Sequence, residues 1–561
     1  MRHLLLPLLL LPILFAPPAG AEPARHASRM VATASPHATA AALAMLGAGG
    51  SAVDAAIAAQ AVLSVVEPHA SGIHGGALLL VWDQAQGRLR FYEGIASAPA
   101  ASPASLVEGG LRVAAVERSG RAVAVPGAIA ALALAHGQHG RLAWAGLFAP
   151  AIALAEQGFP LPPYLAQVLR NRAAELRAVP ALRALYFDPD GTPKPAGARL
   201  RNPDQAEALR LLAAEGPRAL HGGVLGAALL ASAAAHPLPG WITQADLEAY
   251  RAVEREPLCA EILGRRICTA APPASGGLAV LQTLAIGERI GLAQAPPGSV
   301  AATHLFLEAS RLARADRRHW VGDPDRVAVP LAGLLDPLYL AGRAALIAPD
   351  RAMSEAEPGL PPQRHGALPM PGDALAEAAT TQVSILDAGG NAVAFTTTNN
   401  LNFGAELVAM GASLNNGMTN FSTFPGPPGR LAQNRLEPGK RPATTMAPSI
   451  VFGADGRPEI VLGAGGGARI PDAVAAALLA LLVEGRDAFE ATARPRFGAQ
   501  NGVVELEQGT ALAEQAAALT ALGHAPRVVP MNTGLQIVRR LPDGRLEGAA
   551  DPRRDGVAAG E

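Results

Sequence analysis

One stretch of this sequence constrains the fold more than any other. Two strand-like runs, Thr381 to Leu386 and Ala392 to Thr398, flank the turn-forming residues Asp387-Ala-Gly-Gly-Asn391, a pattern that predicts a β-hairpin. If Asp387 pairs with Asn391 around a three-residue loop, counting outwards along both strands places Thr380 directly opposite Thr398. Opposed side chains in such a ladder lie about 4.5–5.5 Å apart at Cβ, so the two hydroxyls are within reach of a hydrogen bond. Thr also favours strands because of its shape, so the pattern alone equally describes an ordinary Thr-rich hairpin.

The rest of the chain alternates between helical and strand-like segments. Helices are expected over residues 38–46, 52–66 and 472–482 and through most of 125–250 and 299–350, and strands over 77–82 and 459–462. Gly and Pro are numerous, at 60 and 49 residues, but they are scattered as turn signals and form no repeat. These features predict layers of helices and strands, α/β or α+β, in one compact body.

A glycine-rich turn, Gly463-Ala-Gly-Gly-Gly-Ala468, joins the expected strand at 459–462 to the helix that follows it. Gly463, Gly465 and Ala468 fit the form of a dinucleotide-binding fingerprint, although the neighbouring βαβ context is weak. Backbone N–H groups at the start of a helix also suit a developing oxyanion. The sequence leaves both interpretations open.

The first residues have the form of an export signal. Met1-Arg2-His3 supplies positive charge, residues 4–15 are almost entirely apolar, and Ala19-Gly20-Ala21 offers small residues for cleavage before Glu22. The apolar run is well short of the roughly 20 residues that span a bilayer. We therefore expect a signal peptide at residues 1–21 and a periplasmic or secreted protein without a membrane anchor.

Charge and cysteine content narrow the expected partners. Lys and Arg (46) nearly balance Asp and Glu (47), and only 4% of residues are aromatic, so a small molecule or peptide is expected and nucleic acid is not. Cys259 and Cys268 are too few to build a metal site, and nothing suggests a cofactor. The two form a disulfide if a hairpin turns at Leu263 and Gly264, whereas a slip of one residue would put the thiols on opposite faces. Five histidines lack ligand spacing and are expected to be structural: His69, His74, His136, His139 and His304.

A series of short motifs runs in order from about residue 30 to residue 538. They are Val65-Val-Glu-Pro68, Val125-Pro-Gly127, Pro272-Pro-Ala-Ser-Gly-Gly277, Ala315-Asp-Arg317, the hairpin that begins at Thr380 with Asn400 and Phe403-Gly404 after it, Leu414-Asn-Asn416, Pro438-Gly-Lys-Arg-Pro442 before Thr444-Thr-Met446, and Gly465-Gly-Gly-Ala-Arg469. This series resembles the γ-glutamyltranspeptidase family. The resemblance implies an α+β fold, the four-layer αββα sandwich of the N-terminal-nucleophile hydrolases.

The resemblance also implies a precursor that cleaves itself between Ala379 and Thr380. Residues 22–379 would form a large subunit and residues 380–561 a small one, associated as a heterodimer. Thr380 would be the nucleophile, hydrogen-bonded to Thr398, with oxyanion donors at Gly466 and Gly467. The freed α-amine, with a pKa of about 7.7–8.0, would be the base for the hydroxyl beside it. A γ-glutamyl amide would acylate Thr380, and water or an amine would discharge the acyl group.

The expected substrate pocket departs from the family pattern. The resemblance assigns five residues to it: Asn400, Asn420, Thr444, Thr445 and, at the position of a family Arg that grips the substrate α-carboxylate, Ile95. Gly417 and Asn420 stand where a Gln and an Asp would hold the α-ammonium. Charge-assisted hydrogen bonds are commonly worth about 1.5–3 kcal/mol each, so losing two of them weakens recognition of a zwitterionic head group. Arg88 or Arg90 is a candidate replacement for the missing Arg.

Three hypotheses follow. The leading one is a γ-glutamyltransferase or glutathione hydrolase that acts through an N-terminal threonine. An alternative keeps the mechanism but takes a glutaryl or cephalosporin-type acyl donor, and a third is a catalytically silent binding homologue. The natural donor, the balance between hydrolysis and transfer, and the oligomeric state are left open by the sequence.

Overall fold

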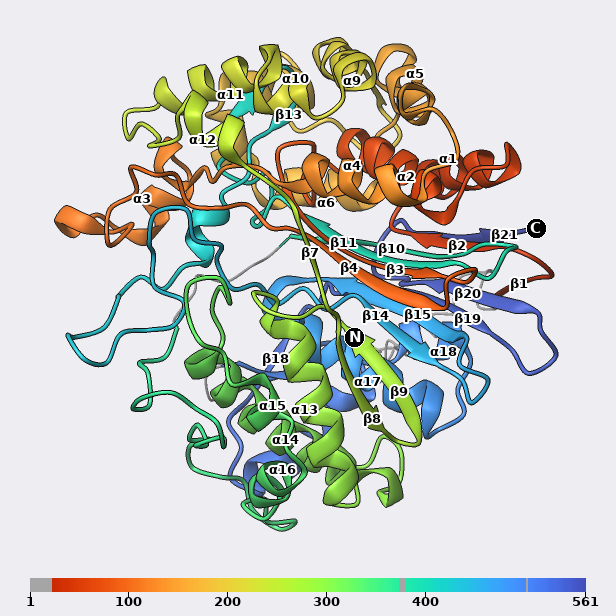
Figure 1. Cartoon of the computed structure of the whole chain (residues 1–561), viewed down its shortest axis with the longest axis vertical. Helices are drawn as coiled ribbons and strands as arrows, with labels where there is room; N and C mark the ends of the chain where they lie inside the picture. Colours follow the sequence, from red (N-terminus) through yellow and green to blue (C-terminus); the bar gives the residue numbers. More distant parts are fainter. Residues whose placement is uncertain (1–22, 373–378, 501–502) are drawn as a thin grey trace, which may run out of the picture.

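Two seven-stranded antiparallel sheets lie face to face at the centre of the molecule, and helices cover both outer faces (Figure 1). The computed structural model describes residues 23–372, 379–500 and 503–561, so the signal peptide expected at residues 1–21 lies outside the described residues. The first sheet has the strand order β1 (Ala24–His26), β20 (Leu546–Ala550), β19 (Gly534–Arg540), β15 (Pro458–Gly465), β14 (Ser449–Phe452), β9 (Arg265–Thr269), β8 (Leu258–Ile262). The second has the order β21 (Val557–Gly560), β2 (Met30–Thr33), β10 (Thr381–Leu386), β11 (Ala392–Thr398), β3 (Gly76–Asp83), β4 (Arg88–Gly94), β7 (Val253–Arg255).

Each sheet packs against its own helix layer. The second sheet is covered by α1 (Pro36–Gly47), α2 (Ala52–Val66) and α4 (Ala128–His139), and the same apolar core extends outward to α5 (Ala149–Gln157), α6 (Pro163–Asn171), α9 (Pro203–Glu215) and α11 (Val224–Ala234). The first is covered by α13 (Ser275–Arg289), α17 (Ile470–Leu482) and α18 (Ala488–Ala493), and α14 (Val300–Trp320) packs against α13. A third apolar core, which includes Leu78, Trp82, Phe452 and Val538, fills the space between the sheets. This arrangement confirms the four-layer αββα fold class.

The central strands are buried on both sides, which explains their long apolar runs. In β10, Val383 and Ile385 join the core beneath the helices. Ser384 faces the other sheet, where its Oγ donates to the carbonyl of Gln536 at 3.0 Å. Because side chains alternate along a strand, the even-numbered positions of β10 face the first sheet.

The helices and strands expected from the sequence near the N-terminus are present with small changes of boundary. The helix expected at 52–66 is α2, and it is buried on every side. Ser51 caps it: the Ser51 Oγ accepts from the N–H of Asp54 at 3.1 Å, while the Asp54 carboxylate accepts from the N–H of Ser51 at 2.8 Å. This reciprocal pair satisfies two N–H groups that a helix start leaves open. The strand expected at 77–82 is the central part of β3.

Cys259 and Cys268 form a disulfide. They lie opposite each other on β8 and β9, and the hairpin turns at Leu263 and Gly264, both with positive φ, at 54° and 68°. Two consecutive residues with positive φ form a type I′ turn, whose backbone twist matches that of the two strands it connects. The register with the turn at Leu263 and Gly264 is therefore the one observed, and the alternative slip of one residue is not.

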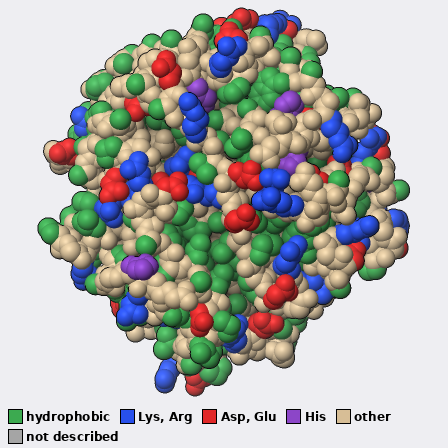
Figure 2. All heavy atoms as spheres, viewed as in Figure 1, with side chains coloured by type: hydrophobic (Ala, Val, Ile, Leu, Met, Phe, Trp, Pro, Cys, Tyr) green, Lys and Arg blue, Asp and Glu red, His purple; other side chains and the backbone are tan. Residues whose placement is uncertain are grey.

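The remaining elements are short. The helices are α3 (Val113–Glu117), α7 (Ala173–Arg177), α8 (Pro180–Tyr186), α10 (Arg218–His221), α12 (Gln244–Ala249), α15 (Leu331–Leu334), α16 (Pro337–Ala344), α19 (Ala511–Glu514) and α20 (Ala516–Ala521). The strands are β5 (Phe159–Pro160), β6 (Arg199–Leu200), β12 (Val408–Ala409), β13 (Ala412–Ser413), β16 (Phe497–Gln500), β17 (Val503–Glu507) and β18 (Pro526–Val529). Within the described residues, no helix combines the length and apolar character needed to cross a bilayer. On the face shown in Figure 2, basic and acidic side chains are interspersed, without an extended area of either sign.

Candidate active site

The β10–β11 hairpin has the register predicted from the sequence. Thr381 lies opposite Thr397 and Leu386 opposite Ala392, and the N–H of Asp387 donates to the carbonyl of Asn391 at 3.0 Å. One step beyond the ladder, the Thr380 and Thr398 hydroxyl oxygens are 3.2 Å apart. Thr380 is completely buried at this end of the hairpin.

The carbonyl of Ala379 lies within reach of both hydroxyls. Thr398 Oγ1 donates to it at 2.7 Å, and Thr380 Oγ1 is also in hydrogen-bonding contact with it. Asn400 is bonded to both residues: its N–H donates to Thr398 Oγ1 at 2.8 Å, and its carbonyl accepts from the N–H of Ala379 at 2.9 Å. A hydroxyl therefore lies beside the carbonyl that precedes it in the chain, and that carbonyl is polarised by a second hydroxyl.

The glycines of β15 allow the two sheets to approach closely at this point. A Cβ on Gly463 would lie 2.3 Å from Oε1 of Gln382, and a Cβ on Gly465 would lie 1.9 Å from the carbonyl oxygen of Thr380. Since β15 pairs antiparallel with both of its neighbours, it is not the first strand of a βαβ unit. The dinucleotide interpretation is therefore wrong: the Gly-x-Gly spacing serves contact between sheets.

Gly466 and Gly467 follow directly after β15 and have positive φ, at 135° and 64°. Gly467 opens a short 3-10 turn that leads into α17. The Thr445 hydroxyl donates to the carbonyl of Gly467 at 3.0 Å. The two glycines predicted to bind an oxyanion therefore directly follow Gly465, which lies close to the Thr380 carbonyl. Thr445 lies beside them.

A small pocket opens next to the hairpin. It is lined by Gly76, Ile95, Ala96, Thr398, Asn399, Asn400, Asn415, Gly417, Asn420, Pro442, Thr444 and Met446. The pocket thus brings together Ile95, Asn400, Asn420 and Thr444 from the predicted set, whereas Thr445 lies at the glycine turn. None of these described lining residues carries a charge.

Three amide oxygens of this lining, Oδ1 of Asn399, Asn400 and Asn420, are buried without a hydrogen-bond partner among the described residues, and so is Nδ2 of Asn399. The amide nitrogen of Asn400 is occupied, since it donates to Thr419 Oγ1 at 2.6 Å. A buried polar atom without a partner is costly, so these three acceptors suit a ligand that brings N–H or O–H donors.

The basic residues suggested as replacements for the family Arg do not reach the pocket. Ile95 is buried just after the end of β4, whereas Arg88 and Arg90 lie near its beginning. Arg88 is 3.5 Å from Glu256 and Arg90 is 2.6 Å from Glu254 in ion pairs. The suggestion is wrong because seven residues of extended strand, at about 3.3 Å each, separate Arg88 from Ile95.

Arg554 and Glu67 are site residues that the sequence reasoning missed. Arg554 Nη1 donates to the Thr380 carbonyl at 2.9 Å and lies 3.4 Å from Glu67 Oε1. Glu67 lies in one of the recognised motifs but had no role assigned. Arg554 follows Asp551 in a dense run of charges, which was the only signal in the sequence.

Three buried residues offer ligand atoms within 4.8 Å of one another: His304, Glu308 and His524. His304, which the sequence led us to expect as a structural residue, is one member of this cluster. Its Nδ1 is 2.8 Å from His524 Nε2, and Arg311 lies 2.7 Å from Glu308 in an ion pair. Since the guanidinium already neutralises the carboxylate, this cluster is better described as a hydrogen-bonded network than as a metal centre.

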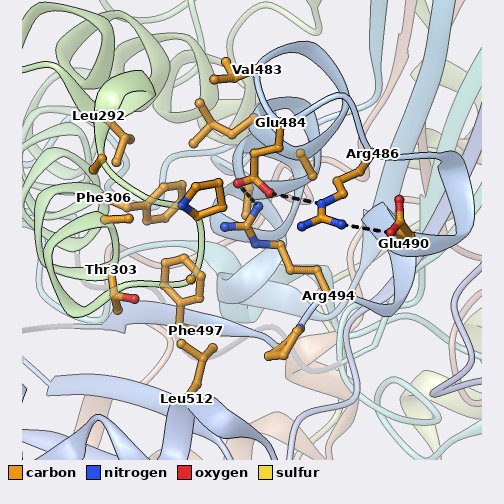
Figure 3. Close-up of a pocket in the computed structure, with 18 of the residues that line it drawn as sticks. Leu292, Thr303, Phe306, Val483, Glu484, Arg486, Glu490, Arg494, Phe497 and Leu512 are labelled. Atoms are coloured by element: carbon orange, nitrogen blue, oxygen red, sulfur yellow. Dashed lines mark hydrogen bonds and ion pairs between the residues drawn. The ribbon is translucent and has the colours of Figure 1, made fainter.

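A larger apolar hollow lies elsewhere, between α14, α17 and α18 (Figure 3). Phe306, Phe497 and Leu512 are part of its wall, and an ion pair between Arg494 and Glu484 lies at one side. None of the predicted site residues lines it. The hairpin pocket, not this hollow, collects the residues suited to chemistry.

Comparisons with known proteins show which family the chain is similar to. The family model for gamma-glutamyltranspeptidase matches residues 38–561. The Acylase ACY 1 proenzyme of Pseudomonas sp. (strain V22) is 38% identical over 552 residues, covering 96% of this chain and 94% of that protein. The glutathione hydrolase proenzyme of Bacillus subtilis (strain 168) is 32% identical over 545 residues, covering 95% of this chain and 91% of that protein.

Among solved structures, the cephalosporin acylase from Bacillus halodurans superposes with a TM-score of 0.84 at 28% sequence identity, covering 98% of this chain and 99% of that one. The match with the family extends over nearly all of the chain and includes the hairpin, the glycine turn and the pocket. The chain therefore belongs to the gamma-glutamyltranspeptidase family.

Proposed function

We propose that this protein is an amidase with an N-terminal threonine nucleophile, made as a precursor that cleaves itself between Ala379 and Thr380. The observation that carries the proposal is the contact of Thr380 Oγ1 with the Ala379 carbonyl, which Thr398 Oγ1 also binds at 2.7 Å. In the first step Oγ1 attacks the Ala379 carbonyl carbon. The C–N bond breaks as the hydroxyl proton passes to the Thr380 nitrogen, which leaves an ester. Water hydrolyses this ester, so Ala379 departs as a carboxylate and Thr380 keeps both its hydroxyl and a free α-amine.

The two products, residues 22–379 and 380–561, would stay together as a heterodimer. Each sheet contains strands from both sides of the cleaved bond: β1, β8 and β9 precede it in one sheet, and β2, β3, β4 and β7 precede it in the other. Separation would break strand pairing within both sheets.

In turnover, the α-amine of Thr380 takes the hydroxyl proton while Oγ1 attacks the substrate amide. Thr398 stays hydrogen-bonded to Oγ1, and the N–H groups of Gly466 and Gly467 stabilise the oxyanion. The amine product leaves with the proton, and the acyl-enzyme is discharged by water or by an acceptor amine. Kinetically this is a ping-pong reaction.

We propose γ-glutamyl amides as donors, because the glutathione hydrolase relatives and the retained Asn400, Thr444 and Thr445 support that acyl group. A second donor class is supported by a specific observation. Without charged lining residues, the pocket has no obvious partner for a zwitterionic head group, and the relative at 38% identity is called an acylase. A glutaryl group, including one carried on a cephalosporin nucleus, has no α-ammonium and so needs no anionic partner from the lining.

Denaturing electrophoresis with N-terminal sequencing tests the nucleophile. Two chains, one of which begins at Thr380, are expected from the wild type, and a single inactive chain from Thr380→Ala. A wild type that stays intact would favour a silent binding homologue, and a Thr380→Ala chain that still splits would refute the mechanism. Rates of hydrolysis of γ-glutamyl and glutaryl p-nitroanilides then decide the donor class. A strong preference for the glutaryl compound would rule out γ-glutamyl amides as the donors.

We also propose that the mature protein is exported. The apolar run at residues 4–15 and the Cys259–Cys268 disulfide both support this, because disulfides persist in oxidising compartments. Cell fractionation should place the protein outside the cytoplasm with an N-terminus at Glu22. A reduced cytoplasmic protein that keeps Met1 would contradict export.

A further inference from the structure

Two paired glycines of the first sheet leave space for a side chain that lies across the sheet. Gly465 of β15 lies opposite Gly534 of β19. A Cβ on Gly534 would come within 2.6 Å of Arg554 Cδ, and a Cβ on Gly465 within 3.1 Å of Arg554 Nη1. The Arg554 side chain therefore lies across both glycines, in a space that exists because neither has a side chain.

The Arg554 guanidinium is almost completely buried, with only 2% of the side chain exposed. Nη1 donates to the Thr380 carbonyl at 2.9 Å, and Nε donates to the Asn532 carbonyl at 3.1 Å. The ring of Tyr164 lies 5.2 Å from the guanidinium carbon. Burying a cation is unfavourable unless its partners are well placed, so this set of contacts must compensate for lost hydration.

Glu67, just after the end of α2, supplies the opposite charge. Its Oε1 lies 3.4 Å from Arg554 Nη1, and the carboxylate is buried. Burial raises the pKa of Glu67 to about 7, against the opposing effect of the Arg554 charge. His69, whose Nε2 is 3.8 Å from Glu67, stays neutral because burial lowers its pKa to about 3.

The Thr380 carbonyl needs this partner because strand pairing does not extend to it. β2 pairs with β10 from Leu386 back to Val383 and no further. On that side of the hairpin the place of a neighbouring strand is taken by Arg554, from the turn between β20 and β21. The contact spans 174 residues of sequence and joins the end of the chain to the proposed nucleophile.

We propose that Arg554, anchored by Glu67, is a positioning residue for Thr380: it holds the Thr380 carbonyl and so fixes the directions of Oγ1 and the α-amine. This inference rests on the proposed function of Thr380. Once Ala379 has left, the hydrogen bond of its N–H to Asn400 no longer tethers the new N-terminus. The carbonyl contact to Arg554 then becomes a main restraint on Thr380.

The charge of Arg554 acts on the same group. Nη1 of Arg554 donates to the carbonyl of the same residue that carries this amine, so we expect the guanidinium charge to disfavour the ammonium form and to keep more of the amine neutral. An ionised Glu67 acts in the opposite direction. The titratable or charged groups around this amine and its anchor are Glu67, His69, Tyr164, Asp551, Arg554 and Asp555.

Four variants separate positioning from charge: Arg554→Gln, Arg554→Lys, Glu67→Gln and a control, Arg265→Gln. The control removes an Arg of a remote ion pair, 2.8 Å from Glu459 at a hairpin end. For each processed enzyme, kcat, KM and the pH profile of kcat/KM are measured with the preferred anilide. Thermal unfolding and N-terminal sequencing are recorded beside them.

Arg554→Gln is expected to lower kcat about ten- to a hundredfold with little change in KM, the factor that corresponds to a charge-assisted hydrogen bond. The acid limb of its kcat/KM profile should move to higher pH by about one unit, because the pKa of the Thr380 α-amine rises when the guanidinium charge is removed. Arg554→Lys should lower kcat but leave the acid limb in place, since the charge stays. Glu67→Gln keeps an acceptor for Arg554 but weakens its anchor, so kcat should fall less than in Arg554→Gln while the acid limb of the pH profile moves to lower pH.

An Arg554→Gln enzyme with the kcat and pH profile of the wild type would overturn the inference. Equal losses in Arg554→Gln and Arg265→Gln would also do so, because they would indicate a general structural effect. If Arg554→Gln fails to fold, the other two variants decide: unchanged kcat in Arg554→Lys together with an unshifted limb in Glu67→Gln refutes it. Failure of the proposed function is distinguishable, since the wild type itself would then lack an N-terminal Thr380.

Discussion

Gly465→Ala is a test of whether the distance between the two sheets fixes the geometry of self-cleavage. Gly465 does not need glycine for its backbone, since its φ is not in the left-handed region. Its added Cβ would nevertheless lie 1.9 Å from the Thr380 carbonyl oxygen, and real Cβ atoms essentially never come closer than 3.0 Å. Either β15 or the Thr380 carbonyl must therefore move by about 1 Å.

The expected effect follows from this displacement. Overpacking of this kind typically costs about 1–3 kcal/mol of stability, which a domain of ordinary stability tolerates. A shift of about 1 Å in a reacting group costs about a hundredfold in rate. We therefore expect a folded Gly465→Ala precursor whose self-cleavage is about a hundred times slower than that of the wild type.

The assay is a time course of cell-free synthesis, stopped in denaturant and separated by electrophoresis, with the fraction of intact chain plotted against time. Gly137→Ala is the matched control: Gly137 lies exposed in α4, and its added Cβ would meet nothing within 4 Å. It should cleave at the wild-type rate and gain up to about 1 kcal/mol from helix propensity. Cleavage of Gly465→Ala at the wild-type rate, with native unfolding, would refute the reasoning.

Three further predictions concern other parts of the molecule. Thr398→Val removes the hydroxyl that donates to the Ala379 carbonyl at 2.7 Å and should slow self-cleavage about tenfold in the same time course; an unchanged rate would show that this polarisation is dispensable. Replacing Cys259 and Cys268 with Ser should lower the free energy of unfolding by about 2–3 kcal/mol, measured by denaturant titration with the oxidised wild type as reference, and an equal midpoint would contradict this. Burial lowers the pKa of His74 from 6.5 to about 4, so the unfolded chain binds more protons in this window and stability should fall by about 3 kcal/mol as pH drops through it; a His74→Asn variant with the same decline would refute that assignment.

The hairpin could be predicted because its rules are local. Turn residues set the loop, the loop sets the register, and the register places Thr380 opposite Thr398 without knowledge of any other segment. The pocket residues that depart from the family pattern could also be identified from the sequence. Ile95, Gly417 and Asn420 stand at motif positions, and all three line a pocket without charges.

The glycine turn and Arg554 could not be predicted in this way. Gly463 and Gly465 have a spacing that suits a nucleotide loop and a contact between sheets equally well. The choice depends on Gln382 and Thr380, which lie some 80 residues earlier in the chain. Arg554 gave even less signal, because its target carbonyl is identified only when β21 pairs with β2 and brings the preceding turn against the hairpin.

This dependence on distant segments has a consequence for the order of events. Ala379 and Thr380 are hydrogen-bonded to Asn400, Thr398 and Arg554, and the Thr380 carbonyl lies close to Gly465 of the facing sheet. All of these must be in place before Oγ1 can lie against the Ala379 carbonyl as it does here. Self-cleavage is therefore expected only in a chain whose two sheets have already closed on each other. The interleaved strands then keep the new N-terminus in the position where it was made.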